Sequence, residues 1–191
     1  MSEAKLRDFA ALVARWSAKI NLVSKSDIPH LWERHIQDSL AIVPYIPPNI
    51  PFAIDIGSGA GFPGMVLAIA TGIPFTLIES DKRKAAFLMD AARELKAPVK
   101  VLATRIEDAK TPPAMLLTAR ALAPLDKLLG LAAPLLASGG ICLFPKGKNH
   151  ELELAPASAL WHMEVERCKN PLDDQACILK VSNLRHVGLP S

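Results

Sequence analysis

Three glycines at alternate positions are the most restrictive feature of the sequence. The apolar run FAIDI at residues 52–56 is followed by GSGAGFPG, which carries Gly57, Gly59 and Gly61. Glycine lets a backbone turn sharply and pass close to a ligand, and a helix that begins after such a turn directs its N–H groups at that ligand. A turn without a ligand rarely needs three glycines. We therefore predict a strand, a ligand-binding turn and a helix that begins after Gly64.

The spacing of these glycines separates two classes of ligand. A dinucleotide fingerprint that begins at Gly57 would need its third glycine where the chain has Phe62. This disfavours a nicotinamide oxidoreductase. The loop instead matches D/E-x-G-x-G-x-G, the pattern of class I methyltransferases, whose ligand has a sulfonium and a carboxylate where NAD has a pyrophosphate.

Short apolar runs alternate with helical patterns along most of the chain, which predicts a parallel sheet. The expected strands after FAIDI are FTLIE, VKVLA, AMLLTARA and ICLF. Helices are expected at residues 81–96 and from Pro124 to Ala137, the second ended by Gly139 and Gly140. Two late runs, WHMEVERC and ACILKVS, are joined by NPLDDQ and predict an antiparallel hairpin. We therefore expect an α/β fold, Rossmann-like, with a mostly parallel sheet and a C-terminal hairpin.

The N-terminal part has a different, helical pattern. Residues 4–20 place apolar side chains three or four positions apart and predict an amphipathic helix. A second helix is expected to begin at Asp27, a good N-cap, with Pro29 in its first turn. The segment PYIPPNIP that follows can neither continue a helix nor fill a central strand. We expect residues 1–46 to form a helical appendage and residues 47–191 to form the ligand-binding domain.

Two acidic positions follow strands of the predicted sheet. Glu79 ends FTLIE 22 positions after Gly57, the distance at which the next parallel strand places an acid beside the first loop. A carboxylate there can accept both hydroxyl protons of a ribose, and a solvated surface acid is the alternative. Further on, Ile106 could flank an adenine ring while Glu107 or a neighbouring amide reads its edge; the alternative is a helix start with favourable acids.

Several polar residues interrupt the apolar face of the second predicted helix. Arg34 and Asp38 are four positions apart on one helical stripe and can pair. His35 and Ser39 fall among apolar neighbours, and buried polar groups need partners. They could hydrogen-bond a loop and pin the appendage to the main domain, or they could contact a substrate. Both roles remain open.

Three basic residues follow strands at the carboxyl edge of the predicted sheet. Arg120 could contact a phosphate, stack on a base or pair with a cofactor carboxylate, or it could form an edge salt bridge. Lys146 and Lys148 follow ICLFP and are candidates for phosphate contacts, with solvated lysines as the alternative.

Composition narrows the environment in which the chain works. Half of its 191 residues are hydrophobic and the net charge is +3, which permits an anionic partner without requiring one. Cys142, Cys168 and Cys177 are widely spaced in apolar stretches and suit reduced, buried thiols of a cytoplasmic protein, with no metal site expected. Neither a signal peptide nor a membrane-spanning run is recognised.

Together these motifs resemble the GidB/RsmG family of bacterial 16S rRNA guanine-N7 methyltransferases. The resemblance rests on NLVS, RHIQDS, DIGSGAGFPG, ESDKRKAAFL, TRIED, ARALAPL and PKG, which extend over most of the chain. Ser58 and Ala60 replace the commoner Thr and Pro of the family loop, and Glu79 stands where many members have Asp.

The resemblance implies methyl transfer from S-adenosyl-L-methionine to N7 of one guanine in the decoding region of 16S rRNA, carried out by a cytoplasmic monomer on the rRNA or the small ribosomal subunit. The cofactor residues it implies are Gly57, Ser58, Gly59, Gly61, Phe62, Glu79, Ser80, Ile106, Glu107 and Arg120. The residues it implies for RNA binding are Arg34, His35, Arg120, Lys146 and Lys148. Arg34, His35, Asp38 and Arg120 are the candidates for positioning the substrate.

Three alternatives stay open at this stage. A class I methyltransferase for another RNA, a protein or a small molecule would share every cofactor residue. A nicotinamide oxidoreductase is disfavoured by the glycine spacing. A nucleotide-binding or RNA-binding module without catalytic activity would bind the same ligands without turnover.

Overall fold

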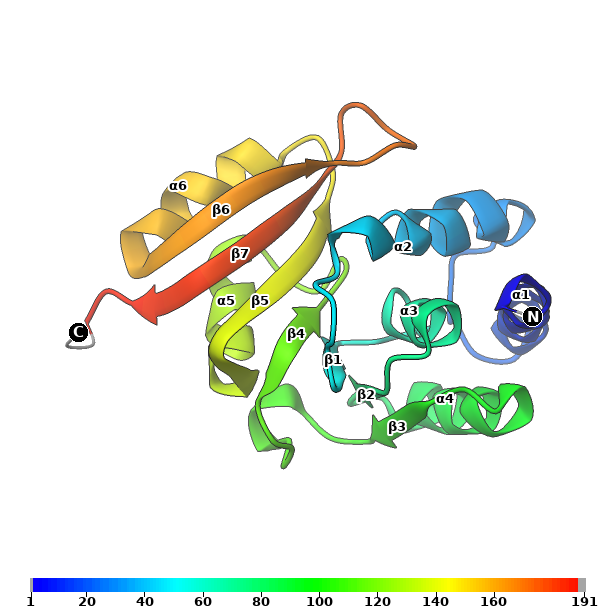
Figure 1. Ribbon diagram of the computed structural model, residues 1–191. Coiled ribbons are helices and arrows are strands. Elements are labelled where there is room, and N and C mark those ends of the chain that lie inside the picture. The colour runs from blue at the N-terminus through cyan, green and yellow to red at the C-terminus, as the bar shows by residue number, and fades with distance from the viewer. Residues whose placement is uncertain (1, 189–191) are drawn as a thin grey trace.

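The fold is built on one seven-stranded sheet, seen in a computed structural model that describes residues 2–188 (Figure 1). The strand order is β3-β2-β1-β4-β5-β7-β6. In that order the strands are β3 Val99–Leu102, β2 Phe75–Ile78, β1 Ala53–Ile56, β4 Ala114–Thr118, β5 Leu136–Lys146, β7 Cys177–His186 and β6 Trp161–Lys169. The first five pair in parallel, and β7 is antiparallel to both β5 and β6. The predicted sheet with its C-terminal hairpin is confirmed.

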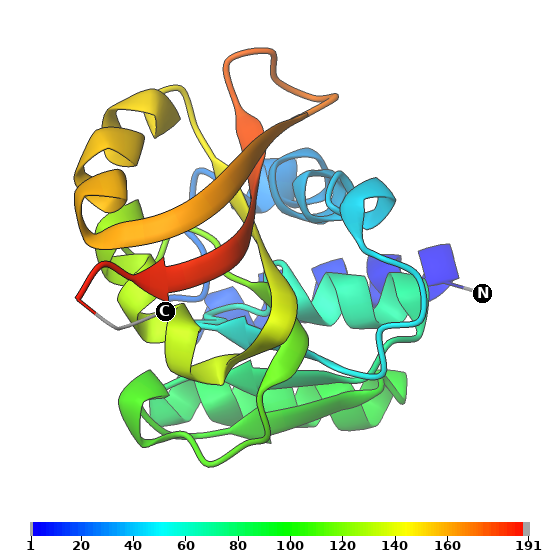
Figure 2. The ribbon, with the colours of Figure 1, turned by 60° about the vertical axis from the view of Figure 1, so that its left-hand side comes forward.

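Helices cover both faces of this sheet (Figure 2). One face carries α3 Gly64–Thr71 and α4 Lys82–Leu95, and the other carries α5 Leu125–Ala132 and α6 His150–Leu160. All residues of β1 and β2 are buried, as expected for strands covered on both sides. Two hydrophobic clusters result, one on each face of the sheet.

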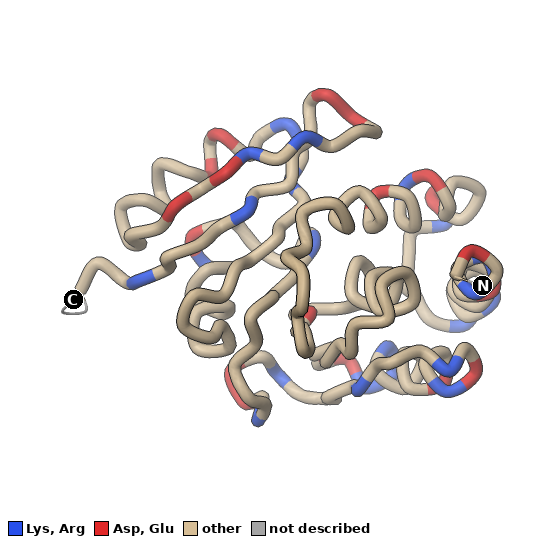
Figure 3. The backbone as a smooth tube through the Cα atoms, viewed as in Figure 1, with Lys and Arg blue, Asp and Glu red and all other residues tan. Residues whose placement is uncertain are grey.

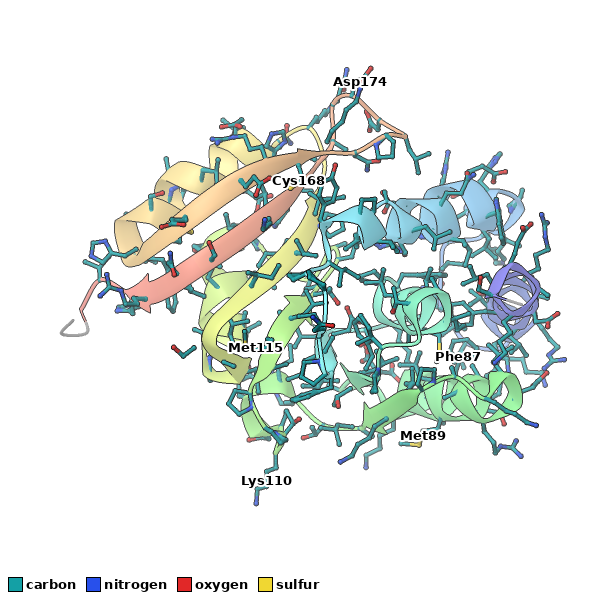
Figure 4. The ribbon with its side chains drawn as sticks, in the orientation of Figure 1. Phe87, Met89, Lys110, Met115, Cys168 and Asp174 are labelled. Atoms are coloured by element: carbon teal, nitrogen blue, oxygen red, sulfur yellow. The ribbon has the colours of Figure 1, made fainter. Side chains whose placement is uncertain are left out.

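The first helix, α1 Ser2–Ser17, is amphipathic as predicted and ends three residues earlier than expected. Its buried residues Leu6, Phe9, Leu12 and Val13 belong to the same hydrophobic cluster as α3 and α4. Phe87 of α4 lies against this helix (Figure 4), with ring centroids 5.6 Å from Trp16 and 6.3 Å from Phe9. The N-terminal segment is therefore packed firmly on the domain that carries the glycine turn.

The prediction of one α-helix from Asp27 is wrong in its details. The segment is divided into η1 Ile28–His30, the π-helix η2 Trp32–Gln37, α2 Asp38–Leu40 and η3 Val43–Tyr45. The side chain of Asp27 caps nothing; its Oδ2 accepts from Ser24 Oγ at 2.6 Å and its Oδ1 from Arg34 Nη1 at 2.7 Å. The Arg34–Asp38 pair is absent from the described residues. Its i, i+4 geometry presupposes an α-helix, whereas a π-helix forms i→i+5 bonds and displaces side chains along the turn.

Two further corrections concern the second half of the chain. The helix expected up to Ala137 ends as α5 at Ala132, and η5 Ala133–Leu135 leads directly into β5. Gly139 and Gly140 thus lie inside a strand, where Gly139 has φ +74° and the pairing with β4 shifts register, as in a bulge. Helix α6 was not predicted, and Pro156 inside it obscures its pattern.

Charged residues gather on the outer helices and the C-terminal hairpin, while the central strands carry almost none (Figure 3). Cys142, Cys168 and Cys177 are free and buried, as predicted. Within residues 2–188, none of the helices combines the length and apolar character needed to cross a bilayer.

Candidate active site

A cavity of about 350 Å³ opens at the carboxyl ends of β1, β2 and β3. This is the edge at which open α/β sheets bind their ligands. Six of the predicted cofactor residues line it: Gly57, Gly59, Glu79, Ser80, Ile106 and Glu107. The structure thus brings together residues from three separate loops, including the short helix η4 Ile106–Asp108.

Glu79 is held rigidly at the floor of this cavity. Its Oε2 accepts a 2.7 Å hydrogen bond from the Gly59 N–H, and its Oε1 accepts one of 2.7 Å from the Asp81 N–H. The residue is only 8% exposed. A carboxylate has about four lone-pair sites, so two remain for the hydroxyl groups of a ligand. Glu79 therefore stabilises the glycine turn and also offers a preorganised hydrogen-bond acceptor to a ligand in the cavity.

The two leading glycines serve different purposes. Gly57 has φ +63°, and a Cβ there would lie 2.5 Å from Leu122 Cδ1, so close packing excludes a side chain. Gly59 has φ +55°, and a Cβ there would meet only the Gly57 carbonyl oxygen, at 3.9 Å. The space over Gly59 is therefore open and is bounded by the cavity walls. A backbone exposed in this way, next to an acceptor carboxylate, fits the amino-acid and ribose parts of S-adenosylmethionine.

Four predicted cofactor residues lie outside the cavity lining: Ser58, Gly61, Phe62 and Arg120. Ser58 is buried and its hydroxyl donates to the Asp55 carbonyl at 3.0 Å. A Cβ on Gly61 would meet Phe9 at 2.9 Å, so this glycine permits packing of α1. Phe62 is 5% exposed and lies beneath the N-terminal segment. Their direct contact with the cofactor stays a prediction.

Asp55 is a buried acid that the sequence analysis included as the first residue of the D/E-x-G-x-G-x-G motif without giving it a role. Its Oδ1 accepts from the Thr118 hydroxyl at 2.6 Å, whereas its Oδ2 is buried without a hydrogen-bond partner among the described residues. Burial raises the pKa of this carboxyl to about 6, although the Thr118 hydrogen bond opposes the shift. Its place in the strand just before the glycines was the available signal.

Arg120 follows β4 and contacts the N-terminal segment at three points. Its Nη1 donates to Asp38 Oδ2 at 3.1 Å and to the Arg34 carbonyl at 3.2 Å, and its Nη2 lies 2.7 Å from His35 Nδ1. The guanidinium also lies over the Phe62 ring, 5.1 Å from its centroid. Of the roles considered for Arg120, the edge salt bridge is the one present in the structure.

Asp38 connects three parts of the fold. While Oδ2 accepts from Arg120, Oδ1 accepts from Asn170 Nδ2 at 3.1 Å. Asn170 begins the turn between β6 and β7, which rises beside α2 with Asp174 at its tip (Figure 4). Tyr45 adds a second link, a 2.8 Å hydrogen bond from its hydroxyl to the Lys169 carbonyl. Sequence reasoning missed Asn170 because no local pattern links it to Asp38.

His35 is neutral in this setting. A guanidinium can only donate, so Nδ1 accepts from Arg120 and the ring proton resides on Nε2. That Nε2 is buried without a hydrogen-bond partner among the described residues, and the nearest carboxylate oxygen, on Asp27, is 3.9 Å away. Burial, followed by the charge of Arg120, lowers the pKa of His35 to about 4. The ring stacks on Phe62 at 4.9 Å, so His35 pins the N-terminal segment to the glycine loop.

A second cavity, of about 530 Å³, lies on the other side of Leu122, which lines both. Its charged walls are Asp38, Arg120, Lys146 and Glu153. Lys146 was expected to reach for phosphate, but its Nζ is 2.6 Å from Glu153 Oε2 and 3.2 Å from the Ala123 carbonyl oxygen.

Three of the predicted RNA-binding residues lie outside this second cavity lining: Arg34, His35 and Lys148. His35 is half-buried against Arg120 and Phe62. Lys148 is exposed and forms no ion pair within the described residues. The Arg34 side chain is 57% exposed and pairs with Asp27. Arg34 and Lys148 are therefore available to a large anionic partner at the molecular surface.

Several solved structures with similar folds are methyltransferases. A putative S-adenosyl-L-methionine-dependent methyltransferase from Methanococcus maripaludis has a TM-score of 0.64 at 12% identity, covering 86% of this chain and 94% of its own. A T. thermophilus 16S rRNA methyltransferase in complex with AdoMet and guanosine has a TM-score of 0.56 at 19% identity, covering 82% of this chain and 41% of its own. At such identities the likeness concerns the fold.

Sequence relatives are much more similar. Ribosomal RNA small subunit methyltransferase G of Gluconobacter oxydans is 53% identical over 96% of this chain and 94% of its own length. The protein of that name from Acidiphilium cryptum is 53% identical over 96% of this chain and 86% of its own. The family described as rRNA small subunit methyltransferase G, GidB, matches residues 2–173. The chain therefore belongs to the GidB family of small-subunit rRNA methyltransferases, as its motifs indicated.

Proposed function

We propose that this protein transfers a methyl group from S-adenosyl-L-methionine to N7 of one guanine in 16S rRNA. The observation that carries the proposal is the pair of cavities that share Leu122 as a common wall. One has the features of a cofactor site and the other has charged walls suited to a polar base. The attacking atom has to contact the methyl carbon directly, so the two sites must adjoin, as these cavities do at Leu122.

The first cavity suits the cofactor by the chemistry of its donors and acceptors. Glu79 would accept the ribose hydroxyls, while the open backbone at Gly59 leaves room for the ligand. Ile106 and Glu107 line the same cavity and would flank the adenine. When bound, the cofactor supplies an electrophilic methyl group on a sulfonium.

The second cavity suits a nucleotide taken out of its helix. Enzymes that modify bases hold the extruded base in a pocket, by stacking and by hydrogen bonds to its edge. Arg120 is fixed there by Asp38 and His35, and the cavity wall continues to Lys146. Exposed Lys148 and Arg34 lie outside it, where they would contact the phosphates that position the RNA.

The proposed reaction needs no general base. Guanine N7 already carries an unshared electron pair, so no proton has to leave before it attacks the methyl carbon. His35 agrees with this, because its Nδ1 is engaged by Arg120 and its pKa is lowered to about 4. Catalysis would rest on aligning N7, the methyl carbon and the sulfur, an effect worth effective molarities of about 10⁵ M or more.

The decisive experiment supplies labelled cofactor with naked rRNA, small ribosomal subunits or intact ribosomes, and maps the modified nucleotide. A second arm replaces the target guanine by 7-deazaguanine, which keeps the Watson–Crick edge but has C–H in place of N7. Binding should persist and methylation should stop. Methylation of the deaza substrate at the normal rate would refute attack by N7, and label in protein instead of RNA would refute the substrate. Size-exclusion chromatography tests the expected monomer.

A further inference from the structure

The second cavity contains two ion pairs whose carboxylates are used differently. Asp38 has both oxygens engaged, one by Arg120 and one by Asn170. Glu153 has both donors on a single oxygen: Oε2 accepts from Lys146 Nζ at 2.6 Å and from the Leu125 N–H at 2.8 Å. Glu153 Oε1 accepts no hydrogen bond from any described residue. Among the carboxylate oxygens of this described lining it is the one without a hydrogen-bond partner, with both lone pairs open to a ligand.

We propose that Glu153 recognises the target guanine through Oε1, which would accept hydrogen bonds from the N1–H and N2 amino groups of the Watson–Crick edge. The proposal rests on the proposed function and names the group that would select the base. An ionised carboxylate only accepts hydrogen bonds, and guanine offers two donors side by side on that edge. Adenine has an acceptor at N1 and is rejected by the same carboxylate.

The surroundings of Glu153 hold its carboxylate in a fixed orientation. Its side chain is 26% exposed and that of Lys146 is 11% exposed, so the pair is largely shielded from water. The Leu125 N–H belongs to the first turn of α5, and Glu153 lies in the first turn of α6, so two helices fix one oxygen. An acceptor oriented before binding costs less entropy when it engages its ligand. Lys146 is then a positioning residue that holds Glu153.

The same arrangement leaves N7 free. In guanine the N1 and N2 donors lie on the six-membered ring, and N7 lies on the opposite side, on the five-membered ring. A base held by its Watson–Crick edge at Glu153 therefore presents N7 away from that residue. The cavity is bounded elsewhere by Leu122, beyond which lies the proposed cofactor site. Recognition and reaction would use opposite edges of one base.

The test compares target guanosine with inosine, which keeps N1–H, O6 and N7 but lacks the N2 amino group. For the unaltered protein we expect kcat/KM to fall by about tenfold or more on this replacement, because the carboxylate loses a charge-assisted partner. In Glu153→Gln the amide oxygen can remain on Lys146, which turns the amide N–H₂ toward the base. We expect guanosine methylation to fall by about tenfold or more in this variant, and its inosine penalty to shrink to within about threefold.

Glu151→Gln is the matched control, since Glu151 lies on the same helix but pairs with Arg167 outside the cavity. It should keep the full inosine penalty. Cofactor affinity, measured by calorimetry, should stay within about threefold in both variants. If Glu153→Gln is unfolded by circular dichroism, Glu153→Asp keeps the charge, shortens the reach and should likewise reduce the penalty.

The outcomes separate this inference from the function on which it rests. If the unaltered protein methylates no guanine in any rRNA substrate, the proposed function fails. If it methylates guanosine and inosine equally well, or if folded Glu153 variants keep the full penalty, only the reading role of Glu153 is refuted.

Discussion

Nδ1 of His35 accepts a 2.7 Å hydrogen bond from Nη2 of Arg120. This bond joins the π-helix of the N-terminal segment to the loop that follows β4. The two residues are 85 positions apart. Both rest on the ring of Phe62, which directly follows the glycine turn. The contact therefore couples the N-terminal segment, the carboxyl edge of the sheet and the glycine turn, and it leaves His35 unable to serve as a base.

Replacing His35 by Gln tests this assignment. A glutamine amide oxygen can still accept from Arg120, so we expect the variant's turnover to stay within about tenfold of the original. In the unaltered protein, single-turnover rates should show no inflection near pH 6.5, the ordinary pKa of histidine. The rates are measured with RNA in excess. A loss of about 10²-fold or more, with cofactor affinity unchanged, would instead identify His35 as a general acid or base.

His35 and Asp55 should change the free energy of unfolding in opposite directions as the pH rises. The pKa of His35 is lowered to about 4, so between pH 4 and 6.5 the unfolded state binds more protons and the free energy of unfolding rises with pH. The pKa of Asp55 is raised to about 6, so between pH 4 and 6 the native state binds more protons and the same free energy falls with pH. Each residue changes the free energy of unfolding by about 3 kcal/mol at most, so the two contributions largely cancel.

Urea denaturation between pH 4 and 7 should separate these two titrations. Asp55→Asn removes the falling contribution, so its stability should climb steeply with pH. His35→Gln removes the rising contribution, so its stability should decline over the same range. Parallel pH profiles for the two variants would contradict the assignment.

Glu79→Ala should weaken S-adenosylmethionine binding by about tenfold or more, because the ribose loses its acceptor and the Gly59 and Asp81 N–H groups lose theirs. Isothermal titration calorimetry measures the affinity. The exposed acid Glu94 on α4 provides the control, since Glu94→Ala should bind normally. Equal affinities in the two variants would remove Glu79 from the cofactor site.

Gly59→Val should abolish cofactor binding while the protein stays folded by circular dichroism. The branched side chain would occupy the open space above the turn, and φ +55° is unfavourable for a β-branched residue. A smaller probe, Gly59→Ala, should retain weakened binding. Normal binding by the valine variant would mean that the turn is structural only.

Lys148→Ala should make the salt dependence of RNA binding shallower by about one unit at most, as expected for one lost phosphate contact. Lys148 follows β5 at the carboxyl edge of the sheet, whereas Lys110 precedes β4 at the opposite edge (Figure 4). Both are exposed lysines, so Lys110→Ala is the matched control and should leave the slope unchanged. A larger effect at Lys110 would place the RNA on the other side of the protein.

The sequence by itself determined the sheet, the glycine turn and the buried face of α1, because these depend on local spacing. Strands covered on both sides read as continuous apolar runs, and an amphipathic helix repeats its apolar residues every three or four positions. Glu79 could be placed beside the turn for the same kind of reason, since a parallel strand and one helix separate it from Gly57. The antiparallel hairpin was visible in its two strand-like runs.

Only the tertiary structure decided how the polar residues are paired. Asp38 takes partners 82 and 132 positions away in place of the helical neighbour Arg34, and Lys146 takes Glu153 from a helix that Pro156 obscured. No periodicity encodes such contacts, because they depend on how elements pack after folding. Neither does it encode the pKa of Asp55, which is raised by burial beneath the glycine turn. Desolvation and distant hydrogen bonds arise only when the chain is compact, and they set the chemistry of this site.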